Sequence, residues 1–105
     1  MSGYSSAFQE LPNSVKELVR QAVSELRPQE IILFGSRARD KHRENSDFDL
    51  CLKGASPDAT ARARFRLRLD EEAITLHRID LVFHEELNED YVRNIGTEGK
   101  LLYAR

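Results

Sequence analysis

The sequence is poor in the residues that mark several special classes of protein. Among its 105 residues are one cysteine, no tryptophan, three prolines and five glycines, and no low-complexity tract or repeat is present. The single cysteine, Cys51, cannot form an internal disulfide, and we expect it to be a small apolar residue on the core side of a strand. No apolar run approaches the roughly 20 residues needed to span a bilayer.

The sequence also lacks a strong excess of one charge. Its formal net charge is -2, which offers no general electrostatic reason to bind nucleic acid or an anionic membrane. The first 14 residues lack the charged start and apolar run of a signal peptide. We therefore expect a cytoplasmic protein that neither enters membranes nor binds nucleic acid directly.

What is present fits one small globular domain. Apolar residues make up 40% of the chain and charged residues 32%, which is ordinary for a globular protein. A chain of this length has room for one modest core. We expect a single domain over residues 1–105, in which the polar residues 1–11 are loosely held.

Apolar spacing and turn residues predict the order α-β-β-α-β-α with a terminal strand. This order indicates an α/β (α+β) fold, a small mixed sheet with helices packed on one face. Asn13 or Ser14 is the expected cap of the first helix, which Pro28 ends. The expected elements are helices over 13–27, 58–74 and 88–95 and strands over 30–35, 47–52, 78–83 and 100–104.

Residues 61–69, "ARARFRLRL", alternate like a strand but consist of strong helix formers without β-branching. We interpret them as helix, with an apolar stripe that faces the sheet. A second stripe lies nearly opposite and either meets a partner subunit or holds scattered surface residues. We expect the arginines between them to be solvated. The facing stripe is Ala61, Phe65, Leu69 and Ala73, the opposite stripe is Ala63, Leu67 and Ile74, and the arginines are Arg62, Arg64, Arg66 and Arg68.

Aspartates recur on one face of two predicted strands. In "DFDLCL" (47–52), Asp47 and Asp49 point to the same side, because side chains alternate across a strand. In "RIDLVF" (78–83), Asp80 lies opposite the apolar positions. If the two strands pair with their apolar faces in the core, the three carboxylates meet on the open face.

Such a cluster repels itself unless a cation neutralises it. Mg²⁺ prefers oxygen ligands and is commonly shared between carboxylates and substrate phosphates. The alternative is that these aspartates are solvated polar positions on an exposed sheet face. The preceding "LFGSRAR" favours the metal site: Gly35 allows a tight turn and a close backbone approach, and Ser36 offers a hydroxyl and an N–H to a phosphate.

Together, "FGSRARD", "SDFDL", "RIDLVF" and the terminal "IGTEGKLLYAR" resemble the DNA polymerase beta-like nucleotidyltransferase superfamily. The short chain and "GSRAR" are similar to the minimal nucleotidyltransferases that accompany HEPN-domain toxins as antitoxins. One departure is Asp40, where many relatives of that subgroup have glycine.

The resemblance implies a role for each matching residue. Gly35 and Ser36 match the motif that holds the nucleoside triphosphate, and Arg37 and Arg39 are candidates for phosphate contacts. Two Mg²⁺ ions would stabilise an in-line attack on the α-phosphate. In the superfamily the third carboxylate also orients or deprotonates the attacking hydroxyl. The matching catalytic and metal-binding carboxylates are Asp47, Asp49 and Asp80.

For the subgroup, the resemblance implies an antitoxin that transfers AMP from ATP to a hydroxyl, commonly a tyrosine, of its HEPN toxin. Two alternatives stay open. The chain could be a binding module that silences a HEPN partner by contact alone, or a stand-alone transferase for a small molecule or nucleic acid.

Overall fold

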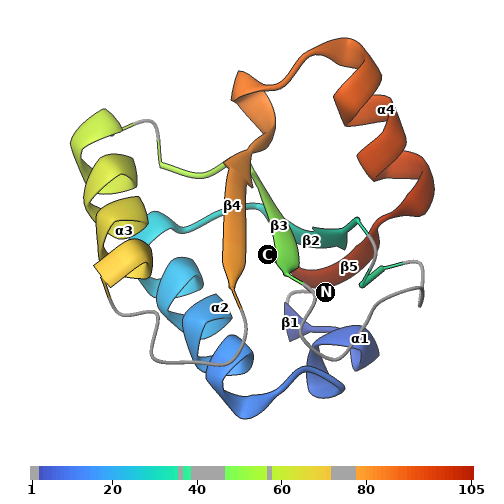
Figure 1. The fold of residues 1–105 in the computed structure, drawn as a ribbon, viewed down its shortest axis with the longest axis horizontal. Helices are drawn as coiled ribbons and strands as arrows, with labels where there is room; N and C mark the ends of the chain where they lie inside the picture. The colour runs from blue at the N-terminus through green and yellow to red at the C-terminus, as the bar shows by residue number, and fades with distance from the viewer. Residues whose placement is uncertain (1–2, 36, 39–46, 57, 72–77) are drawn as a thin grey trace.

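The computed structural model describes residues 3–35, 37–38, 47–56, 58–71 and 78–105 (Figure 1). A 3₁₀ turn, His84–Glu86, follows the fourth strand. The other elements are β1 (Gly3–Tyr4), α1 (Ser6–Gln9), α2 (Asn13–Leu26), β2 (Glu30–Phe34), β3 (Phe48–Lys53), α3 (Ala59–Glu71), β4 (Ile79–Phe83), α4 (Glu89–Glu98) and β5 (Lys100–Ala104).

The strands form one mixed sheet in the order β1-β5-β2-β3-β4. Only the β3–β4 pair is parallel; the other pairs are antiparallel. The expected α/β class and each expected strand are confirmed to within a residue or two of the predicted bounds. The C-terminal strand β5 lies inside the sheet, between β1 and β2.

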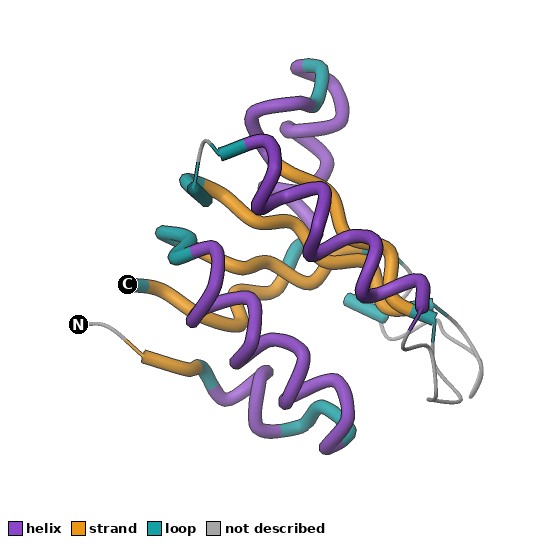
Figure 2. The backbone as a smooth tube through the Cα atoms, turned by 90° about the vertical axis from the view of Figure 1, so that its left-hand side faces the viewer, coloured by secondary structure: helices purple, strands orange, loops and turns teal. Residues whose placement is uncertain are grey.

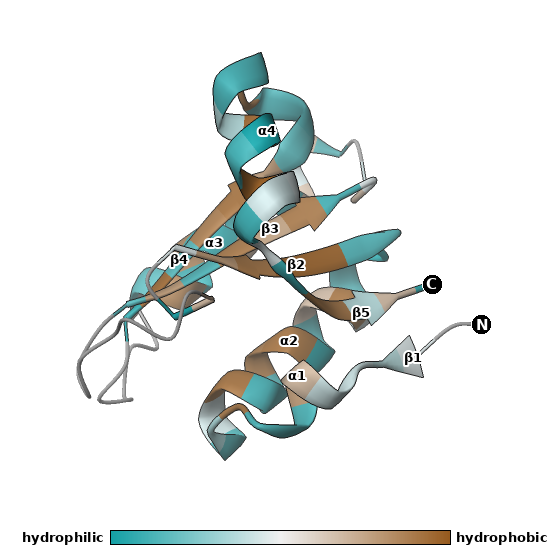
Figure 3. Ribbon diagram, turned by 90° about the vertical axis from the view of Figure 1, so that its right-hand side faces the viewer, coloured by the Kyte–Doolittle hydropathy of each residue, from teal (hydrophilic) through white to brown (hydrophobic). Residues whose placement is uncertain are grey.

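Helices cover both faces of this sheet. In Figure 2 the strands run between helices, and in Figure 3 α4 stands above the sheet while α1 and α2 lie below it. The lower layer holds the main core, but the expectation of helices on one face alone is wrong, because α4 covers the other face. The helix α4 adds a smaller apolar cluster on the other face, where Phe34, Cys51 and Ile95 are buried. The main core contains Val15, Val19, Leu26, Ile31, Leu50, Leu52, Phe65, Phe83 and Leu102, among others.

Helix α2 begins at Asn13, and its cap lies one residue before the expected one. The carbonyl of Pro12 accepts the N–H groups of Val15 and Lys16 at 3.0 and 2.9 Å, so Pro12 is the cap residue and the prediction of Asn13 or Ser14 is wrong. The helix ends at Leu26, and Arg27 follows in the left-handed conformation, directly before Pro28.

The N-terminal segment is held more firmly than expected. Residues Gly3–Tyr4 pair with β5, and α1 brings Phe8 to 1% exposure in the main core. Burying such a side chain stabilises the fold by about 1.5–3 kcal/mol. The expectation of a loose segment is therefore wrong for residues 3–11. It failed because their strand partner, β5, lies at the other end of the sequence.

Residues 59–71 are helical, so the composition of "ARARFRLRL" prevails over its alternation. Phe65 is buried and Ala61 and Leu69 pack beside it, whereas Leu67 on the opposite stripe is 58% exposed. The two stripes are thus confirmed. Their last members, Ala73 and Ile74, lie outside the described residues.

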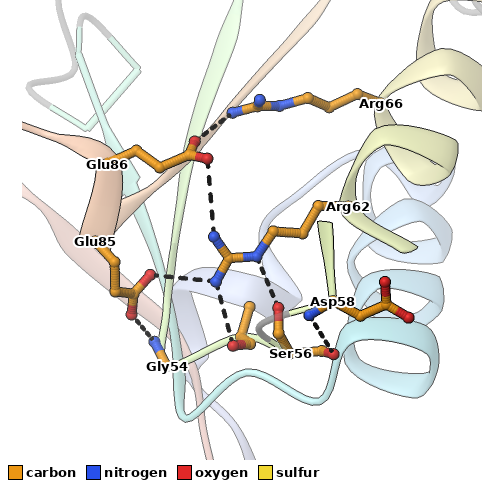
Figure 4. A network of polar contacts seen from close by, with 8 residues as sticks. Gly54, Ser56, Asp58, Arg62, Arg66, Glu85 and Glu86 are labelled. Carbon is orange, nitrogen blue, oxygen red and sulfur yellow. Dashed lines mark hydrogen bonds and ion pairs between the residues drawn. The ribbon is translucent and has the colours of Figure 1, made fainter. Parts of the chain in front are cut away.

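Arg62 is not solvated as expected; its side chain is 15% exposed. Its guanidinium donates to the carbonyls of Ser56 and Ala55 at 2.7 and 3.3 Å. It also forms ion pairs with Glu85 and Glu86 at 3.7 and 3.8 Å (Figure 4). This network fastens α3 to the C-terminal ends of β3 and β4.

Helix α4 begins after Asn88, whose side chain accepts the N–H of Tyr91 at 2.8 Å. It continues past Gly96 and ends at Glu98, so Gly99 is the terminating glycine. Within the described parts of the chain, no helix combines the length and the apolar character needed to cross a membrane.

Candidate active site

The three predicted carboxylates lie at the end of the sheet where β3 and β4 begin. In the parallel pair, Asp49 stands directly opposite Asp80, and Asp47 lies immediately before β3. The neighbours of Asp49 along its strand, Phe48 and Leu50, point into the main core. The expected pairing, with the aspartates opposite the core, is therefore confirmed.

The charges of these carboxylates act on one another. Burial, together with the negative charges of Asp80 and Asp47, raises the pKa of Asp49 to about 6. Asp49 is half-buried, whereas Asp47 and Asp80 are exposed. Asp49 is thus shifted toward its protonated form.

Carboxylate oxygens are the donors that a hard cation such as Mg²⁺ prefers. The shared level of Asp49 and Asp80 on adjacent strands also suits such an ion. Among the residues that the structure describes, however, no three Asp, Glu, His or Cys side chains are grouped closely enough to hold a metal ion. Mutual repulsion of like charges is a physical reason for this spread. The donor chemistry fits, while the close grouping of all three stays a prediction.

Gly35 touches the carboxylate set directly. It follows β2 with φ +74°, a backbone conformation that favours glycine. A Cβ at this position would overlap the Asp49 carboxylate. The carbonyl of Gly35 accepts the N–H of Ala38 at 3.1 Å, which closes a turn. Glycine is therefore required here both for the turn and for the approach to Asp49.

The rest of the predicted phosphate loop is only partly visible. Ser36, Arg39 and Asp40 lie outside the described residues. Arg37 is described, and its guanidinium carbon lies 4.2 Å from the centre of the Phe48 ring. Because Phe48 and Asp49 point to opposite faces of β3, this position holds Arg37 beside the core face. Of the predicted nucleotide-binding residues that the structure describes, Gly35 is the one whose close approach to Asp49 is established.

No sequence motif placed α4 in the site. The expectation that the carboxylate face of the sheet is open is wrong: α4 packs on it and leaves a cleft of about 220 Å³ between this helix and the strands. The Tyr91 ring stands edge-on to Phe34, with centroids 5.8 Å apart. Burial raises the pKa of Tyr91, and the charges of Asp49 and Asp80 raise it further. The cleft is lined by Phe34, Gly35, Asp49, Tyr91, Asn94, Ile95 and Glu98.

The spacing of the α4 residues is the one feature of the sequence that indicates a shared helix face here. Tyr91, Asn94, Ile95 and Glu98 stand at i, i+3, i+4 and i+7, which is one face of a helix. That spacing shows that they face the same way, but not what they face. Only the packing of Ile95 on Phe34 and Cys51 places this helix face beside Asp49.

The residues of this site lie within a region that matches a known protein family. The profile of the Nucleotidyltransferase domain matches residues 15–103. A protein of Methanocaldococcus jannaschii named as a protein adenylyltransferase is 31% identical over 101 residues, covering 92% of this chain and 95% of that protein.

Two solved structures share the fold. A chain of a toxin–antitoxin complex with AMP-PNP is 26% identical with a TM-score of 0.63, over 89% of this chain and 73% of that one. A second structure is a tri-AMPylated HEPN toxin of Shewanella oneidensis in complex with an MNT antitoxin. It matches at 24% identity and a TM-score of 0.57, over 89% and 69% of the two chains, a likeness of fold alone.

Proposed function

Because the chain belongs to the nucleotidyltransferase domain family, we propose that it transfers AMP from ATP to a hydroxyl group of a HEPN-domain toxin and acts as its antitoxin. The observation that carries this proposal is the register of Asp49 with Asp80, next to the glycine turn at Gly35. A protein acceptor is supported by the relative named as a protein adenylyltransferase and by the likeness to a toxin–antitoxin complex.

The reaction is a substitution at the α-phosphorus of ATP. The acceptor hydroxyl oxygen forms a new bond to that phosphorus, while the bond to the oxygen that bridges to the β-phosphorus breaks. Pyrophosphate leaves with the bridging oxygen, and the hydroxyl proton passes to a carboxylate and then to water. Asp80 is the carboxylate we propose for this proton, because it is exposed and thus open to an acceptor.

Asp47, Asp49 and Asp80 are the residues that would hold two Mg²⁺ ions. When bound, the ions neutralise the charge that gathers on the phosphate oxygens. The raised pKa of Asp49 is consistent with this role, since a nearby cation would favour the ionised form of its carboxylate.

We place the triphosphate at the turn after β2, with Gly35, Ser36 and Arg39 as its expected contacts. Arg37, whose guanidinium lies over the Phe48 ring, would have to turn away from that ring to join them. The remainder of the nucleotide would extend into the cleft beside α4. There the ring of Tyr91, which is 42% exposed, offers an aromatic surface. In this arrangement the bound nucleotide would extend from the turn after β2 to α4.

The test is intact-mass measurement of a HEPN-domain partner after incubation with this protein, ATP and Mg²⁺. We expect an AMP-sized increase on the partner, lost when Asp47→Ala and Asp49→Ala are combined. Asp90→Asn, whose side chain is 91% exposed on α4, is the matched control and should keep the activity. Neutralisation of the toxin without an adduct, unchanged in the double variant, would instead establish inhibition by contact.

A further inference from the structure

The strand β4 forms one edge of the sheet. It pairs with β3 on one side, and among the described residues no strand lies on its other side. The opposite edge is the two-residue strand β1. The five residues of β4 therefore make the longer exposed edge, about 16 Å at the usual rise per residue.

A groove of about 370 Å³ follows this edge. Ile79 and Leu81 point to one face of the sheet and Asp80 and Val82 to the other. Since all four line the groove, it must run along the edge itself rather than over either face. Asp80, the carboxylate proposed to receive the hydroxyl proton, is thus a wall of this groove.

The backbone groups on this edge are arranged for another strand. The N–H of Phe48 donates to the carbonyl of Arg78 at 2.8 Å, which sets the phase of the parallel ladder. By alternation, Asp80 and Val82 direct their backbone groups to β3, and Ile79 and Leu81 direct theirs outward. In the described part of the chain no backbone partner is found for these outward groups. Such a row of donors and acceptors suits an extended peptide.

The other wall of the groove is the side of α3, where Arg66, Leu69 and Asp70 face β4. Arg66 is held in place: it forms an ion pair with Glu86 at 3.2 Å (Figure 4). Its guanidinium carbon also lies 4.7 Å from the centre of the Phe83 ring. This wall thus presents the apolar side chain of Leu69 together with the cation Arg66 and the anion Asp70. This mixed surface suits a peptide backbone and its side chains better than the apolar face of a helix.

We propose that an extended segment of the protein acceptor adds to the free edge of β4 and so brings its reactive hydroxyl to Asp80. This inference rests on the proposed function, because it assigns the place where that acceptor docks. A segment in this groove passes Asp80 whichever direction it runs. The strand β4 would therefore both bind the acceptor segment and carry the carboxylate that receives its proton.

The first test blocks the groove. Asp70→Trp fills it from α3, whereas Arg64→Trp places the same side chain among Ala59, Ala63 and Leu67, on the outer face of that helix. We expect Asp70→Trp to weaken binding of the HEPN-domain partner, measured without ATP, about tenfold or more. Arg64→Trp should bind like wild type, with both variants melting near the wild-type temperature. The reverse order of effects would overturn the proposal and assign docking to the outer face of α3.

The second test follows backbone amide exchange of the labelled protein with and without the partner. We expect new protection at the outward amides of Ile79 and Leu81, while Asp80 and Val82, already paired with β3, change little. Binding with AMP transfer but without this protection would overturn the edge proposal and leave the proposed function intact. Failure of both binding and transfer would overturn both. Protection that rises with the concentration of this protein alone would assign the edge to a second copy instead.

Discussion

At the scale of single residues, the site depends on how closely Gly35 approaches Asp49. The turn after β2 has a left-handed φ of +74°, and any side chain there would overlap the carboxylate. The same glycine therefore serves the fold and the chemistry. A substitution at this position should damage both.

We expect Gly35→Ala to lower the free energy of unfolding by about 1–3 kcal/mol, because of backbone strain and displacement of Asp49. AMP transfer should fall with it. Gly96→Ala is the matched control: Gly96 lies inside α4 with open space around its Cα, so alanine should stabilise the protein by about 0.5–1 kcal/mol. Urea denaturation measures both values. A Gly35→Ala protein as stable and active as wild type would refute this role.

The raised pKa of Asp49 predicts how stability depends on pH. Its value of about 6 in the folded protein exceeds the ordinary 3.8, so the folded state binds this proton more tightly than the unfolded state does. The resulting stabilisation is complete below about pH 4 and is lost as pH rises through 6.

Asp49→Asn should remove this contribution and give a flatter pH profile between pH 4 and 7, measured by chemical denaturation in metal-free buffer. Asp90→Asn should retain the wild-type profile, since that side chain is 91% exposed. An Asp49→Asn profile as steep as that of the wild type would show that Asp49 does not carry the effect.

At the scale of helices and strands, α4 forms one wall of the proposed nucleotide cleft. Contact between an aromatic ring and a base contributes about 1–3 kcal/mol. We therefore expect Tyr91→Ala to raise the KM for ATP about tenfold, with kcat changed less. Arg93→Ala, on an exposed part of the same helix, should leave KM unchanged. Steady-state kinetics test this, and an unchanged KM in Tyr91→Ala would remove Tyr91 from the cleft's function.

The polar network around Arg62 connects α3 to the segments that follow the C-terminal ends of β3 and β4. Truncation leaves the carbonyls of Ser56 and Ala55 without this donor and separates two glutamates from their cation. We expect Arg62→Ala to lower the free energy of unfolding by about 1.5–3 kcal/mol. Arg62→Lys should restore little of it, because an ammonium cannot reproduce the planar fork. Arg64→Ala, on the exposed face of α3, should stay within about 0.5 kcal/mol of wild type.

Local patterns were sufficient to predict most elements. The apolar spacing of residues 15–26 and the β-branched run of 30–34 gave bounds within a residue or two of α2 and β2. Alternation was also enough to put Asp47 and Asp49 on one face and to pair them with Asp80. These predictions succeeded because each depends on a period within one strand or helix.

Predictions that required contacts between distant segments failed. Phe8 is buried because β5, at the other end of the chain, pairs with Gly3–Tyr4. Tyr91 joins the site because α4 packs on the sheet face opposite the main core. Arg62 is withdrawn from water by glutamates more than 20 residues away in sequence. Neither propensity nor periodicity contains this information.

At the scale of the whole molecule, the two faces of the sheet differ in what they pack against. The central strands β2 and β3 carry the core on one face and the cleft with α4 on the other. The carboxylates lie where β3 and β4 begin, next to the free edge that we assign to the acceptor. In our proposal the nucleotide would approach Asp49 through the cleft of α4, and the acceptor would approach Asp80 through the groove of α3.

The initial rate of AMP transfer to the HEPN-domain partner, followed by intact mass with and without Mg²⁺, tests this account most directly. We expect transfer by the wild-type protein to require Mg²⁺ and to fall about a hundredfold or more in Asp80→Asn. Asp90→Asn, a carboxylate that is 91% exposed on α4 and outside the groove, should keep the wild-type rate. Transfer that proceeds equally well without a divalent cation, or undiminished in Asp80→Asn, would contradict the account.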